Sequence, residues 1–235
     1  MGKMHGSACL AVAILGALAM LAGCKQPQGQ SQGQGQATTP AKTRPADGWT
    51  VVYAADFKVA GKLPAEWKAL AGEGKIDGGA LVLTAPSDDE GQIVLLAPQV
   101  PGSVRVECVA SLKGDPISDI SPFINADTSG YASGYLFQFG GKANTVNWLN
   151  RYDTPFDDTM KTSPLIKPGQ KYQILAENDG GRLRLVIDGQ EIFRHADPEP
   201  LKGPSHDRIG FYTWGCTLMI EKLSVSAKPA EGAGK

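Results

Sequence analysis

The chain has 235 residues, with 23 basic and 24 acidic side chains and therefore a formal net charge of -1. This near-neutral balance, without a basic stripe, gives no electrostatic reason to expect a nucleic-acid partner. Apolar residues make up 42% of the chain, which excludes wholesale disorder, and 29 glycines and 16 prolines favour short strands joined by turns.

An apolar run from Ala8 to Leu21 follows a short basic segment that contains Lys3. The run is too short for a typical transmembrane helix and has the length of the apolar part of a signal peptide. It ends in Leu21-Ala22-Gly23-Cys24, which resembles the lipobox of bacterial lipoproteins. The resemblance implies a signal peptide over 1–23 and lipid attachment at Cys24; an ordinary secretory signal, cleaved elsewhere, is the alternative.

The lipid would bind the protein to a membrane and would place the protein outside the cytoplasm. Lys25, rather than Asp, follows the cysteine, and by resemblance to lipoproteins of bacteria with two membranes this favours the outer membrane. Residues 24–47 comprise the lipidated cysteine and a Gln/Gly-rich segment with little to bury, which predicts a disordered tether. Residues 229–235 are predicted to be a disordered tail.

Residues 48–228 are predicted to form one β-domain, because short apolar segments with period-two alternation recur throughout them. The predicted strand segments are, in chain order, 49–57, 74–84, 92–97, 103–112, 119–125, 134–139, 144–152, 170–177, 182–188, 191–194, 207–214 and 217–226. Asp77-Gly78-Gly79, Asn178-Asp179-Gly180-Gly181 and Asp188-Gly189 are strong hairpin signals. Because no amphipathic helix is evident, we predict an all-β, two-sheet antiparallel sandwich.

Two of the four cysteines fall inside this domain. Cys9 lies in the leader and Cys24 is the predicted lipid site, which leaves Cys108 and Cys216. Exported proteins can form disulfides, so a Cys108–Cys216 bridge and two buried free thiols are the two alternatives. The chain has no CxxC motif or His/Cys cluster, and no structural metal site is expected.

Several sequence segments of the domain resemble those of a known group of proteins. They are Trp67 followed by residues 76–81, then 134–139, 178–189 and 208–214. In this order they resemble the concanavalin A-like lectin/glucanase superfamily and, more narrowly, the 3-keto-disaccharide hydrolase domain family and its unassigned relatives. The resemblance implies a jelly-roll sandwich over 48–228 whose concave sheet face binds the ligand.

The chain departs from the catalytic pattern of that family. Leu136 and Phe137 precede Gln138 where the family usually has an acid, and Tyr212 replaces a usual Gln. The closing strand has Glu221-Lys222 in place of an Arg-Asn pair. Retaining hydrolysis needs two carboxylates roughly 5 Å apart, and no predicted strand segment supplies them at a spacing of two. Non-catalytic binding is therefore the expectation, with a glycoside hydrolase or lyase acting on 3-keto or related sugars as the alternative.

Aromatic rings can stack on sugar rings while amides and guanidinium groups bond to the hydroxyls. Trp148 lies in a segment rich in hydrogen-bonding groups, and alternation places Tyr212 and Trp214 away from the core side of their strand. The residues predicted to bind carbohydrate are Gln138, Trp148, Arg151, Tyr212 and Trp214. Ordinary core aromatics are the alternative, and an envelope module with a protein partner is a further functional alternative.

Other polar clusters carry weaker functional signals. His195 and Asp197 combine an imidazole with a carboxylate, as acid–base catalysis requires, but the prolines around them favour a turn-stabilising cluster. The acidic runs Asp88-Asp89-Glu90 and Asp157-Asp158 lack the ligand spacing of a known Ca²⁺ loop. We therefore expect solvated loops and no cofactor, with Ca²⁺ as the alternative.

Overall fold

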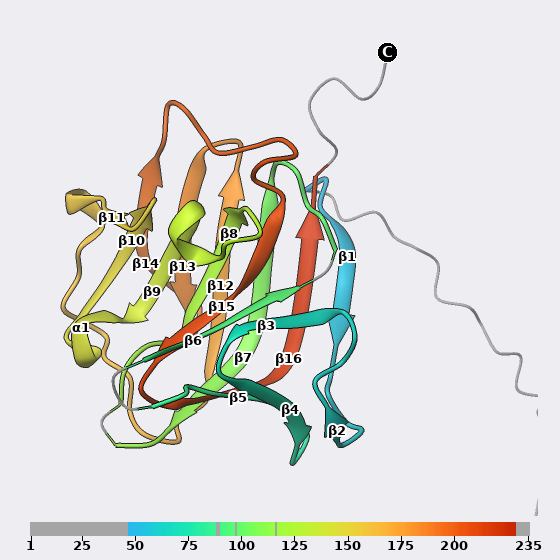
Figure 1. Ribbon diagram of the computed structural model, residues 1–235. Helices are drawn as coiled ribbons and strands as arrows, with labels where there is room; N and C mark the ends of the chain where they lie inside the picture. Colours follow the sequence, from blue (N-terminus) through green and yellow to red (C-terminus); the bar gives the residue numbers. More distant parts are fainter. Residues whose placement is uncertain (1–46, 88–89, 97, 116, 229–235) are drawn as a thin grey trace, which may run out of the picture. The chain divides into compact units, whose positions relative to one another are not determined.

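The structure is a computed structural model that describes residues 47–87, 90–96, 98–115 and 117–228 (Figure 1). The predicted signal peptide, the lipid site at Cys24, nearly all of the tether, the 229–235 tail and the acidic pair Asp88-Asp89 lie outside the described residues. None of the described helices is long and apolar enough to cross a membrane.

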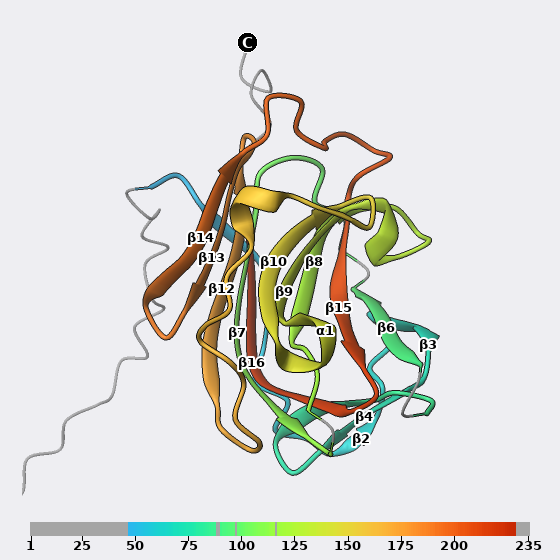
Figure 2. The same ribbon diagram turned by 90° about the vertical axis from the view of Figure 1, so that its left-hand side faces the viewer.

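Two antiparallel sheets form the domain and face each other as two layers (Figure 2). The nine-stranded sheet contains β1 (Thr50–Ala55), β2 (Gly61–Lys62), β4 (Glu73–Asp77), β5 (Ala80–Thr84), β7 (Val104–Lys113), β12 (Tyr172–Asp179), β13 (Arg182–Ile187), β14 (Gln190–Ala196) and β16 (Thr217–Ala227). The seven-stranded sheet has the order β11 (Thr154–Pro155), β10 (Val146–Arg151), β9 (Tyr135–Gly140), β8 (Ser121–Ala126), β15 (Arg208–Trp214), β6 (Gly91–Leu96) and β3 (Trp67–Ala71). The helical elements are single turns, namely η1 (Tyr131–Ser133), α1 (Gly141–Asn144) and η2 (Asp157–Thr159). The predicted all-β sandwich is confirmed.

The three predicted hairpin turns are present, and glycines adopt the left-handed backbone that each turn requires. Gly78 and Gly79 have φ of 57° and 79° between β4 and β5, and Gly180 and Gly181 have φ of 62° and 93° between β12 and β13. Residues other than glycine rarely adopt such angles, so the glycines alone predict these turns from the sequence.

The core lies between the sheets and follows the alternation of the strands. In β9, Tyr135, Phe137 and Phe139 are fully buried in the core, whereas Leu136 belongs to a smaller apolar cluster on the opposite side of the same sheet. Successive side chains of a strand point to opposite faces. The seven-stranded sheet thus presents a second face, away from the core, which we call the outer face.

Cys108 and Cys216 are both buried free thiols. Cys108 lies in β7 opposite Leu223 of β16, whereas Cys216 precedes the start of β16 at Thr217. Seven positions along the strand direction correspond to roughly 20 Å, well beyond the Cα separation that a disulfide allows. Of the two alternatives, the pair of buried free thiols is therefore the one found, and burial raises the pKa of Cys108 to about 12.

The first and last described strands are neighbours. Thr50 of β1 pairs with Ala227 at the end of β16. The ring of Trp49 lies 4.5 Å from the guanidinium carbon of Arg105 and 4.8 Å from the ammonium of Lys228. These cation–π contacts hold the start of the domain against its last strand.

Candidate functional site

The outer face brings four of the five predicted binding residues onto one surface. Gln138 of β9 lies directly opposite Trp148 of β10, so the two side chains point to the same side of the sheet. Tyr212 and Trp214 of β15 alternate with the core residue Phe211 and therefore point to that side as well. The predicted orientation of the two β15 aromatics is confirmed.

A chain of hydrogen bonds joins these strands. Nε1 of Trp148 donates to Oε1 of Gln138, which also accepts a 2.8 Å bond from the amide of Asn150. Nε2 of Gln138 in turn donates to Oδ2 of Asp119 at 3.4 Å. Two donors at its oxygen and a carboxylate acceptor at its nitrogen therefore fix the orientation of the Gln138 amide.

Asp119, which sequence reasoning did not select, is the centre of this network. Its carboxylate accepts hydrogen bonds from the Ser121 hydroxyl, from the Ser118 hydroxyl at 3.0 Å and from the Trp214 backbone N–H at 3.2 Å. The residue is 1% exposed. Burial disfavours the charged form and raises the pKa of Asp119 to about 6, although the donors oppose that shift.

The outer face is mostly closed, and Trp214 is its exposed aromatic. Trp214 is 43% exposed and lies opposite Gly91, which has no side chain to cover the indole. Tyr212 is 7% exposed because the ring of Tyr131 from η1 packs on it, with centroids 4.4 Å apart. Of these aromatics, Trp214 therefore offers the largest surface for stacking.

Trp148 is 9% exposed, and the ammonium of Lys142 lies 4.7 Å from the centre of its ring. Lys142 belongs to α1, which follows β9 (Figure 2). The indole of Trp148 is therefore largely covered, and its N–H is bonded to Gln138. The exposed group above the ring is the ammonium of Lys142.

The backbone of α1 is left-handed at three consecutive non-glycine residues. Lys142, Ala143 and Asn144 have φ of 50°, 54° and 59°. Such angles cost about 1–2 kcal/mol per residue, so other contacts must impose them. The Asn144 side chain supplies two of these contacts, a 2.8 Å bond to the carbonyl of Ile166 and a 2.9 Å bond from its N–H.

Arg151 does not lie on the outer face, which corrects its predicted place beside Trp148. It is opposite Tyr135, a core-facing residue, and donates from Nη1 to both oxygens of Asp197 at 3.0 and 3.1 Å. The physical reason is alternation, because three positions separate Trp148 from Arg151 and so place them on opposite faces.

The weak catalytic candidates His195 and Asp197 make separate structural contacts. Asp197 is 6% exposed and accepts a 2.5 Å bond from the hydroxyl of Tyr135 in addition to Arg151. His195 stacks on Phe156 with centroids 4.0 Å apart and lies 2.9 Å from Asp158. These contacts join segments that are distant in the sequence, and the buried Asp197 differs from the solvated cluster expected here.

In the described part of the chain, no group of three or more His, Cys, Asp or Glu side chains is arranged to hold a metal ion. The Asp157-Asp158 pair lies in η2, and Asp158 contacts His195.

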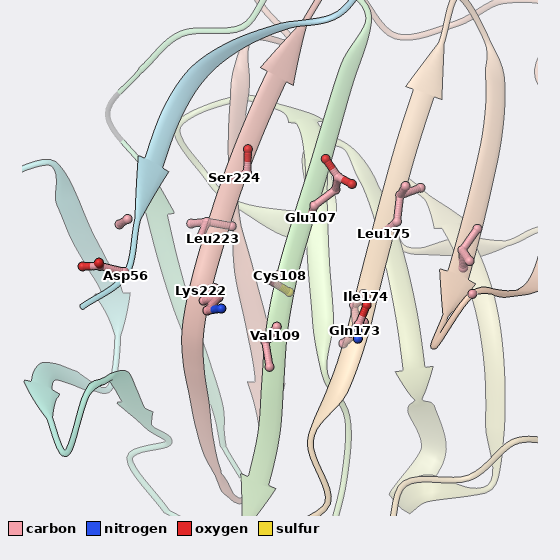
Figure 3. Close-up of a pocket in the computed structure, with 13 residues that line it drawn as sticks. Asp56, Glu107, Cys108, Val109, Gln173, Ile174, Leu175, Lys222, Leu223 and Ser224 are labelled. Atoms are coloured by element: carbon pink, nitrogen blue, oxygen red, sulfur yellow. The ribbon is translucent and has the colours of Figure 1, made fainter. Parts of the chain in front are cut away.

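A separate cavity of about 580 Å³ lies on the nine-stranded sheet (Figure 3). Glu107, Leu175 and Ser224 line it from β7, β12 and β16, three strands that lie side by side. None of the predicted carbohydrate-binding residues contributes to this lining.

The comparisons with known proteins identify the fold. No family model and no curated protein matches the chain. Among solved structures, the carbohydrate-binding module CBM66 from Bacillus subtilis is 15% identical, with a TM-score of 0.58 over 69% of this chain and 96% of that one. A Bacillus subtilis protein of unknown function with a galectin-like fold is 17% identical, with a TM-score of 0.59 over 76% and 97%. The carbohydrate recognition domain of Emp47p is 16% identical, with a TM-score of 0.55 over 78% and 99%. The chain thus has a lectin-like β-sandwich fold, shared with domains named for carbohydrate binding.

Proposed function

We propose that this protein binds carbohydrate on the outer face of the seven-stranded sheet and does not transform it. The observation that carries the proposal is the 43% exposed indole of Trp214 beside the partly exposed amide of Gln138, which the buried side chains of Asp119 and Asn150 hold in place. An exposed ring next to oriented hydrogen-bonding groups suits the apolar face and the hydroxyls of a sugar. The solved structures of similar fold that are named for carbohydrate binding support the same proposal.

Replacing Trp214 with alanine should weaken glycan binding by about tenfold or more, since an aromatic anchor typically contributes more than 1 kcal/mol. Isothermal titration of the full chain with a ligand from a glycan array measures this loss. Met160→Ala is the matched control, because Met160 is a large apolar residue with 42% exposure outside the network. Absence of binding to every glycan, or equal binding by the Trp214→Ala variant, would contradict the proposal.

A hydrolase or lyase acting on 3-keto or related sugars is the second candidate, in line with the family resemblance. The observation that favours it is the raised pKa, about 6, of the buried Asp119 carboxyl, which meets this face through the 3.4 Å hydrogen bond that it accepts from Gln138. Among the described residues, no second carboxylate makes a hydrogen bond to Asp119, Gln138, Trp148 or Asn150. The binding proposal expects no turnover of a 3-keto disaccharide, and turnover that Asp119→Asn abolishes would favour the enzyme.

We further propose that lipid on Cys24 anchors the protein outside the cytoplasm, in the outer membrane where the cell has two. The motif Leu21-Ala22-Gly23-Cys24 after an apolar run supports this. Acyl chains bury about 0.8 kcal/mol per methylene, so several chains give durable attachment. Cys24→Ser should move the protein from the membrane fraction to the soluble fraction and abolish labelling by a fatty-acid analogue. Membrane retention and labelling in this variant would contradict the anchor.

A further inference from the structure

The polar network of the outer face directs its donors inward. Ser118 and Ser121 donate to Asp119, whereas Trp148 and Asn150 donate to Gln138. Asp119 itself is 1% exposed, so a ligand does not reach its carboxylate. A ligand on this face therefore meets few side-chain donors that are not already bonded within the protein.

Lys142 is an unbonded donor beside this network. Its side chain is exposed, and its ammonium makes no hydrogen bond or ion pair with any residue in the described ranges. The ammonium lies over the ring of Trp148, 4.7 Å from the ring centre. An ammonium carries three donors and a full positive charge. This group is free to bind an anion on the ligand.

The backbone holds Lys142 in this place. The left-handed φ angles from Lys142 to Asn144 are imposed by the two hydrogen bonds between Asn144 and Ile166 and by the bond from the Thr145 hydroxyl to the Lys142 carbonyl at 2.8 Å. Strained backbone that surrounding contacts over-determine is common at ligand sites. The turn thus positions a cation over a buried indole beside Gln138.

Lys142 and Trp214 lie at the same end of the outer face. The contacts run without interruption from Trp214 to Asp119, Gln138, Trp148 and Lys142. These residues lie in or next to β15, β8, β9 and β10, which are successive neighbours, and three strand spacings amount to roughly 14 Å. One sugar ring cannot span this distance.

From these observations we infer that the ligand is an acidic oligosaccharide, with a carboxylate or sulfate on Lys142 and a sugar ring on Trp214. This inference rests on the proposed function and specifies its ligand class. An ammonium and a ligand anion attract each other most strongly where neighbouring protein groups do not already neutralise the charge. Because the contact is partly exposed, salt should weaken it.

The test uses the full chain on an array of uronate-containing and sulfated oligosaccharides, each paired with its neutral parent. We expect the acidic members to bind about tenfold or more tightly than their parents. Lys142→Met should reduce acidic binding to the level of the neutral parent, and Lys142→Arg should retain most of it. Lys68→Met is the matched control, because Lys68 is exposed on the same face at the far edge strand β3.

The outcomes separate this inference from the proposed function. Equal binding of acidic and neutral members, or an acidic preference unchanged in Lys142→Met, overturns the inference and leaves carbohydrate binding intact. Absence of binding to every glycan overturns both. Should Lys142→Met fail to fold, as judged by its thermal melt, the salt dependence of the unaltered chain decides, since acidic binding that ignores ionic strength contradicts the ion contact.

Discussion

Replacing Asp197 with alanine is expected to lower the free energy of unfolding by about 3 kcal/mol, the lower end of the range for breaking a buried ion pair. The substitution leaves the Arg151 guanidinium and the buried Tyr135 hydroxyl without their acceptor. The side chain of Arg151 is 26% exposed and regains some hydration, which favours the lower figure. Urea denaturation followed by tryptophan fluorescence measures the change.

Asp158→Ala is the control for this prediction. Asp158 also faces a basic side chain, His195, but its own side chain is 62% exposed. Exposed ion pairs contribute about 0–1 kcal/mol, so this variant should remain close to the unaltered protein. An Asp197→Ala variant as stable as the Asp158→Ala variant would show that the buried network does not stabilise the fold.

Asp119 should make the domain less stable as the pH rises. Its folded-state pKa of about 6 lies above the ordinary value of 3.8, so the folded state binds the proton more tightly. The stabilisation is fully present below the unfolded pKa and is lost as the pH rises through about 6. Between about pH 4.5 and about pH 7.5, the loss amounts to about 2 kcal/mol.

The measurement compares the unaltered chain with Asp119→Asn, so that contributions from other titrating groups cancel. Relative to Asp119→Asn, the unaltered chain should lose about 2 kcal/mol of unfolding free energy as the pH rises across this interval. A difference that stays constant with pH would mean that Asp119 titrates as it does in the unfolded chain. Asparagine keeps one acceptor for the Trp214 N–H, which makes it a conservative replacement.

Features set by near neighbours in the chain could be predicted from the sequence. The turns at Gly78-Gly79 and Gly180-Gly181 follow from the backbone freedom of glycine. The shared face of Tyr212 and Trp214 follows from alternation with Phe211. Both features depend on residues only a few positions apart.

Arg151 shows how composition can mislead. The polar side chains of its segment suggest a shared site with Trp148, although alternation places residues three apart on opposite faces of a strand. In the structure Arg151 instead meets Asp197, which lies 46 positions later in the chain. The pairing of β10 with β9, which sets this orientation, is a long-range property.

Asp119 and Lys142 were beyond prediction for a different reason. Asp119 becomes a site residue only because β8, β9 and β15 bring Ser121, Gln138 and Trp214 around it. The left-handed turn at Lys142 depends on Asn144 reaching Ile166, 22 positions away. Such contacts arise from tertiary packing, which the local propensities of a sequence do not encode.

Strand β16 extends from one end of the domain to the other. One end, at Ala227, lies beside Thr50, where the chain enters the domain, and the other end, at Thr217, follows Trp214 by three positions. Its 11 residues span roughly 33 Å. The end of the domain that carries Trp214 and Lys142 is therefore the end remote from Thr50. The exposed indole and the ammonium therefore lie far from the terminal strand pairing of the domain.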